Sequence, residues 1–187
     1  MTELRVYTTT ALEGIPSQLY IGLLVIFCVG AGLLLWRNGL REGLRNSALL
    51  LLTEWVVIVL AIAVSCRETG AEPRINLIPL SSYFDIAENS YLKEVAVINI
   101  LNVALFIPVG LLAGCGFRGM TWRRALVIGV TLSVVIELLQ LMFRKGLCET
   151  DDVIHNVVGC MIGYGVTRLF SLTRMGTRSA SRKVTLA

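Results

Sequence analysis

Charged side chains are scarce in this sequence. Asp, Glu, Lys and Arg make up 16% of its 187 residues, whereas soluble domains usually contain about 25%. Histidine occurs once and the five cysteines include no Cys-x-x-Cys pair, so the usual ligands of a zinc site are lacking. The net charge of +4 is explained by a few basic loops and the tail, and we expect no nucleic acid among the partners.

Hydrophobic residues are correspondingly abundant. Hydrophobic residues make up 55% of the chain and occur in long blocks, as in integral membrane proteins, where about 20 apolar residues cross the bilayer as a helix. Five runs are near this length: Leu19–Trp36, Ala48–Ser65, Val95–Phe117, Ala125–Phe143 and Val153–Phe170. The sequence therefore predicts an all-α polytopic membrane bundle of about five transmembrane helices over residues 19–170, without a separate soluble domain.

Arginine and lysine predict the orientation of these helices, because basic loops stay on the cytoplasmic side. They cluster in the loop after the first run, in the loop before the fourth run and in the tail: Arg37, Arg41, Arg45, Arg118, Arg123, Arg124, Arg174, Arg178, Arg182 and Lys183. Five helices place these three segments on one side. We therefore expect an extracytoplasmic N-terminal segment over residues 1–18, a cytoplasmic basic tail over residues 171–187, and the remaining loops outside.

Polar residues inside the apolar runs gather at one depth. A rise of about 1.5 Å per residue places these in the outer half of the bilayer: Asn99, Asn102, Glu137, Gln140, Asp152 and Asn156. Asp151 lies just before the last run, and four further polar residues would lie just above: Arg74, Asn76, Arg144 and Lys145. Such groups are costly in hydrocarbon unless they pair or line a wet cavity.

Two interpretations of this polar set are open. The groups could be hydrogen bonds between helices, each worth about 0.6 kcal/mol. A mixture of carboxylates, amides and cations at one depth favours instead a cavity that opens outward. The segment Pro73–Leu80, whose apolar residues argue against full exposure, is expected to tuck against the mouth of this cavity.

Two glycine pairs predict which helices pack together. Gly110 and Gly114 in the third run, and Gly159 and Gly163 in the fifth, have the small-xxx-small spacing that lets membrane helices approach closely. We therefore expect the third and fifth runs to be neighbours.

Several short motifs, taken in order and spacing, resemble the VanZ-like membrane proteins. They are Asn76-Leu77-Ile78-Pro79, Asn99-Ile100-Leu101-Asn102, Phe106-Ile107-Pro108-Val109-Gly110, Ser133 with Ile136-Glu137-Leu138-Leu139-Gln140, and Asp151-Asp152 with Asn156, Gly159 and Gly163. The resemblance covers about residues 74–170 and departs at Glu149, where many members carry Asp. It implies a multi-pass protein of the bacterial cell membrane. The family's namesake is linked to low-level resistance to teicoplanin and related lipoglycopeptides, so the resemblance implies a phenotype without a reaction.

The first functional hypothesis is a non-enzymatic binding or modulating protein. Its outer cavity would hold a lipid-linked envelope component or the acyl chain of a lipoglycopeptide, amid membrane lipids. Arg74, Arg144 and Lys145 would meet a phosphate. Sugar or peptide groups would be bound by the remaining polar residues: Asn76, Asn99, Asn102, Gln140, Asp151 and Asn156. The lack of a nucleophile next to a base favours this hypothesis.

Two other hypotheses use the same residues differently. In a membrane-embedded hydrolase or transferase acting on an outer-leaflet lipid-linked substrate, Glu137 would be the catalytic acid or base and Asp152 the second carboxylate. The sequence requires no cofactor, although Glu137, Asp151 and Asp152 would suit a divalent cation. A small transporter or flippase would use Glu54 and Glu137 as two stations, but visible repeats, which many transporters have, are lacking.

Overall fold

A computed structural model describes residues 17–65, 74–80, 92–144 and 147–184. Four α-helices dominate the described part: α2 (Ser17–Ser65), α4 (Leu92–Gly116), α5 (Trp122–Met142) and α6 (Thr150–Val184). Two strands, β1 (Arg74–Asn76) and β2 (Leu147–Glu149), pair in parallel. Each of the four helices contains a stretch long and apolar enough to cross a membrane, so the expected all-α membrane bundle is confirmed.

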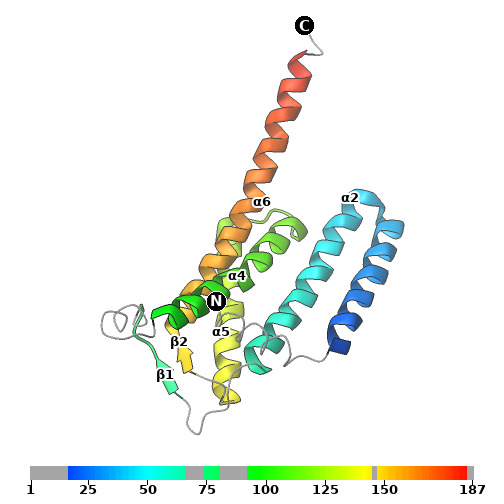
Figure 1. Ribbon diagram of the computed structural model, residues 1–187. Helices are drawn as coiled ribbons and strands as arrows, with labels where there is room; N and C mark the ends of the chain where they lie inside the picture. The colour runs from blue at the N-terminus through cyan, green and yellow to red at the C-terminus, as the bar shows by residue number, and fades with distance from the viewer. Residues whose placement is uncertain (1–16, 66–73, 81–91, 145–146, 185–187) are drawn as a thin grey trace.

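Helix α2 consists of two helices joined at Gly39. This residue has φ 72° and ψ 171°, a conformation open to glycine because it lacks a Cβ atom. The chain reverses there, and the two limbs of α2 lie side by side (Figure 1). A Cβ atom added to Gly30 would collide with the Leu50 side chain, and one added to Gly43 would collide with the Leu35 backbone. The limbs correspond to the first two expected runs, which accounts for four continuous helices where about five were expected.

Helices α4 and α6 form the close contact that the glycine spacing predicts. A Cβ atom added to Gly110 would overlap the backbone of Cys160, and one added to Gly163 would overlap the backbone of Ile107. Gly159 meets Val103 in the same way. The predicted packing of the third and fifth runs is therefore confirmed. The core around this contact is apolar: Val59, Phe106, Val109, Ile136 and Cys160.

The turns divide between two ends of the bundle. The reversal of α2, the turn between α4 and α5, and the projecting C-terminal part of α6 lie at one end, and β1 and β2 lie at the other (Figure 1). Thr121 starts α5 at the first end, where its hydroxyl accepts a hydrogen bond from the Arg124 backbone N–H at 3.4 Å. This division agrees with the sequence-based prediction that the basic loops and the remaining loops lie on opposite sides of the bundle.

The two terminal segments are described to different extents. Residues 1–16 of the expected outer segment lie outside the described residues. Helix α6 continues to Val184, so the backbone of the expected basic tail is helical through most of its length. The side to which each segment is exposed stays a prediction from the Arg and Lys pattern.

Candidate functional site

The strand pair joins two polar segments that lie far apart in the sequence. In the parallel register, Asn76 lies opposite Glu149. The Thr150 hydroxyl donates a hydrogen bond to the Asn76 carbonyl oxygen at 3.5 Å. The Asn76 side-chain oxygen accepts from the Ile78 backbone N–H at 3.3 Å, which is the turn-forming bond typical of asparagine. Asn76 therefore shapes the backbone at this end of the bundle.

The apolar side chains after β1 are more exposed than the sequence predicts. Leu77 is 72% exposed and Ile78 is 66% exposed. The segment does pair with β2 through the backbone of β1, but these two apolar side chains remain largely exposed. Leu77 and Ile78 are therefore not covered by the described part of the bundle.

Asp151 anchors the end of this segment to α6. Its carboxylate accepts a hydrogen bond from the Leu80 backbone N–H, and the residue is only 1% exposed. Leu80 has φ 61°, a left-handed conformation that is uncommon for a branched residue. The bond to Asp151 helps to hold this conformation. Asp151 also lies in the first turn of α6, where the helix dipole stabilises a negative charge.

Glu137 on α5 makes a hydrogen bond to the backbone of β2. Its carboxylate oxygen Oε2 accepts a hydrogen bond from the Glu149 backbone N–H at 3.0 Å, and the residue is 4% exposed. The contact links the C-terminal part of α5 to β2. Glu137 and Asp151 therefore both turn their carboxylates toward backbone donors of the polar segments at this end.

Asp152 and Asn156 lie one turn apart on α6 and reach two different helices. The Asn102 side-chain amide on α4 donates to the Asp152 carboxylate at 2.7 Å. The Asn156 amide donates to the Ser133 hydroxyl on α5 at 2.9 Å. Asn99, one turn before Asn102, is also buried. The expected common face of Asp152 and Asn156 thus carries polar contacts to both neighbours of α6.

Gln140 has one acceptor without a partner in the described part of the chain. Its amide nitrogen donates to the Ala63 carbonyl oxygen near the end of α2 at 3.1 Å. Its side-chain oxygen Oε1 is buried and has no hydrogen-bond partner among the described residues, although the residue is only 2% exposed. A buried acceptor without a partner is costly, so this oxygen is a candidate contact for a ligand donor.

Of the three predicted cations, Arg144 is the one whose side chain is described. Arg144 is exposed at the end of α5 and has φ 54°. The backbone of Arg74 lies in β1, but its side chain and all of Lys145 lie outside the described residues. The placement of a phosphate near these residues therefore stays a prediction.

The carboxylates are not arranged as a metal site. Within residues 17–65, 74–80, 92–144 and 147–184, no group of three or more His, Cys, Asp or Glu side chains is placed to hold a metal ion. Glu137, Asp151 and Asp152 instead accept hydrogen bonds from three separate donors.

Some groups that contact the site were not among the residues predicted from the sequence. Ser133 belongs to the motifs quoted from the sequence and shares a helix face with Glu137, four residues away, but it is not among the predicted site residues. The backbone N–H groups of Leu80 and Glu149 also donate hydrogen bonds to the site. Such contacts cannot be predicted from residue types, because every residue except proline has a backbone N–H group. His155, which is adjacent to the polar face, has its Nδ1 atom 2.6 Å from the Asp151 carbonyl oxygen, one turn back on its own helix.

Comparison with known proteins places this arrangement among membrane proteins of one family. Residues 47–171 match the family described as VanZ/LLP1, a match that also includes most of the second limb of α2. A stretch of 69 residues is 35% identical to Protein VanZ of Enterococcus faecium. This stretch covers 35% of the chain and 43% of that protein, so it spans less than half of the relative's length. No solved structure matches.

Proposed function

Because the chain belongs to the VanZ/LLP1 family of membrane proteins, we propose that it binds or modulates a lipid-linked envelope component or a lipoglycopeptide. The site is the end of the bundle that carries β1 and β2, facing outward from a bacterial cytoplasmic membrane. Through this binding the protein contributes to teicoplanin-type resistance, the phenotype linked to the family's namesake.

The observation that carries the proposal is the burial of three carboxylates at this one end. Glu137, Asp151 and Asp152 are 4%, 1% and 2% exposed. A charged residue at the centre of a membrane helix costs at least about 2.5 kcal/mol on insertion scales. Glu137 lies near the end of α5 and the two aspartates lie in the first turn of α6, so each costs less than this, but burial of a polar group still carries a penalty. Apolar residues would pack the same helices at a lower cost of insertion. Retention of all three is better explained by a polar site than by packing alone.

Two further features support a ligand with both a polar part and an acyl chain. The unpartnered Oε1 of Gln140 can accept a hydrogen bond from a hydroxyl or amide group. The exposed side chains of Leu77 and Ile78 lie on the segment that Asp151 anchors. They offer an apolar surface to an acyl chain beside the polar groups.

Binding to teicoplanin, with and without its acyl chain, tests the proposal. The full-length protein in lipid nanodiscs is titrated with each form. We expect the acylated form to bind more tightly, since the glycopeptide and acyl parts contact different groups. Thermal unfolding measurements establish that the protein is folded. If folded protein binds neither form, the proposal for this ligand is contradicted. A covalently altered ligand recovered from the sample would favour the hydrolase or transferase.

A further inference from the structure

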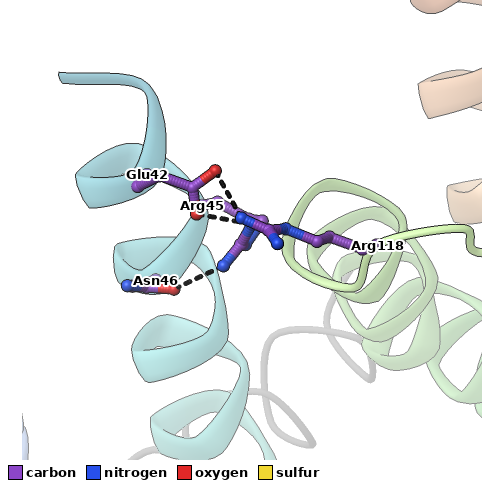
Figure 2. A network of polar contacts seen from close by, with 4 residues as sticks. All are labelled: Glu42, Arg45, Asn46 and Arg118. Carbon is purple, nitrogen blue, oxygen red and sulfur yellow. Dashed lines mark hydrogen bonds and ion pairs between the residues drawn. The ribbon is translucent and has the colours of Figure 1, made fainter. Parts of the chain in front are cut away.

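A second polar cluster lies at the opposite end of the bundle, where α2 reverses and α4 ends. Figure 2 shows the Glu42 carboxylate between two guanidinium groups. Its oxygen Oε1 is 2.7 Å from Arg118 Nη2, and its oxygen Oε2 is 2.5 Å from Arg45 Nη1. Arg45 also donates from Nη2 to the Asn46 side-chain oxygen at 3.4 Å. One carboxylate therefore orients two arginines, one from α2 and one from the turn between α4 and α5.

These residues border a cavity of about 650 Å³. Its lining comes from both elements: Arg41, Glu42, Leu44, Arg45, Cys115 and Arg118. The volume lies within the roughly 300–1,000 Å³ typical of small-molecule sites. Three arginines and one glutamate leave two positive charges in excess. Each guanidinium carries five N–H donors, so the contacts to Glu42 leave donors for another acceptor.

We propose that this cavity binds the phosphate group of an anionic phospholipid. Arginine suits phosphate because its planar fork donates two parallel hydrogen bonds. Leu44 and Cys115 add an apolar wall that is exposed in the isolated protein, as the first carbons of an acyl chain require. A free anion would need the arginines but not this wall. The arginine pattern places this end at the cytoplasmic leaflet, which carries anionic lipids.

The bound lipid would join two parts of the bundle. Arg41 and Arg45 belong to the second limb of α2, whereas Arg118 follows α4. A phosphate shared by these arginines holds the two segments together, in addition to the Glu42 ion pairs. Lipid binding therefore stabilises the folded protein, and this is the quantity to measure.

Thermal unfolding of the full-length protein in detergent, with added lipid, tests the proposal. Phosphatidylglycerol is compared with phosphatidylcholine and with inorganic phosphate, and native mass spectrometry counts the bound lipids. We expect phosphatidylglycerol to raise the unfolding temperature most. Arg118→Gln should bind it about tenfold more weakly, because the variant loses a charge-assisted hydrogen bond to the phosphate.

Arg123→Gln is the matched control. Arg123 lies at the same end, with its guanidinium 5.4 Å from the Trp122 ring, and does not border the cavity. This variant should bind phosphatidylglycerol like the wild type. If Arg118→Gln does not fold, Arg41→Gln provides the same test, because it removes a lining cation and keeps the two ion pairs of Glu42.

Three outcomes would overturn the proposal. Equal stabilisation by phosphatidylcholine would show that the charge of the lipid is irrelevant. Unchanged binding in a folded lining variant would show that the lipid binds elsewhere. Stabilisation by inorganic phosphate equal to that by phosphatidylglycerol would assign the cavity to a free anion.

Discussion

The side-chain amide of Asn102 on α4 donates a 2.7 Å hydrogen bond to the carboxylate of Asp152 on α6. The two helices that it joins are also those brought into close contact by Gly110 and Gly163. Asp152 thus takes part in helix packing and is a candidate ligand-binding carboxylate. Substitutions can separate these two roles.

Exchange of the pair tests whether the carboxylate is needed at position 152. Asn102→Leu should lower the free energy of unfolding by about 1–2 kcal/mol, because Asp152 loses an amide donor. The double variant Asn102→Asp with Asp152→Asn retains one amide and one carboxylate, so its thermal stability should approach that of the wild type. We expect it nevertheless to bind teicoplanin more weakly. Wild-type affinity in the exchanged protein would contradict a ligand-binding role for Asp152.

Two glycines two residues apart on α6 test the helix contact. Gly163→Ala places a Cβ atom against the Ile107 backbone, whereas a Cβ atom at Gly165 has nothing within 4 Å. Overpacking of this kind typically costs about 1–3 kcal/mol, so Gly163→Ala should unfold at a lower temperature. Gly165→Ala should be neutral or slightly stabilising, because alanine favours the helix. Equal unfolding temperatures of the two variants would mean that α4 and α6 do not pack as described.

The orientation is tested by labelling from outside the cell. A cysteine at Gly14 should react with a membrane-impermeant reagent in intact cells, whereas one at Ser179 should react after lysis alone. The physical reason is the concentration of arginine at the end where α2 reverses. A variant without the native cysteines supplies the background. Labelling of both positions from the same side would contradict five crossings.

Glu54 provides a contrast with Glu137. It lies in the second limb of α2, is 7% exposed, and its Oε1 atom has no hydrogen-bond partner among the described residues. Glu54→Gln should leave teicoplanin binding unchanged, because Glu54 lies about 13 Å along α2, at about 1.5 Å per residue, from Ala63, which contacts Gln140. Glu54→Leu should raise the free energy of unfolding by about 1 kcal/mol or more, since it removes an unsatisfied buried group. Loss of function in Glu54→Gln would support the transporter hypothesis.

The apolar runs and one helix pairing could be predicted because both have local signals, although the first two runs form the single bent helix α2. Apolar length fixes the crossings, and the spacing of Gly110, Gly114, Gly159 and Gly163 fixes one close contact. The reversal at Gly39 was predicted as a loop between two runs. The parallel pairing of β1 with β2 was not predicted, since each strand has three residues. Such short segments have no periodicity, and their meeting depends on where α4, α5 and α6 place their ends.

The residues of the site were easier to predict than their partners. Depth along each helix identified Glu137, Asp152 and Asn156, because a membrane penalises polar groups. The partner of each depends on helix rotation and on backbone donors. Thus Glu137 meets the Glu149 backbone and Asn156 meets Ser133, contacts that the residue types alone did not specify.

Teicoplanin tolerance of a susceptible bacterial host expressing Glu137→Gln is the most direct test of the central claim. The substitution keeps an acceptor for the Glu149 N–H group and removes only the ionisable group. Wild type and Glu54→Gln serve as the active references, and membrane levels are matched by immunoblot. The proposed site predicts that Glu137→Gln folds and inserts normally while tolerance falls to that of the empty vector. Tolerance equal to that of the wild type would show that Glu137 is only a structural hydrogen-bond acceptor, and would contradict the proposed site.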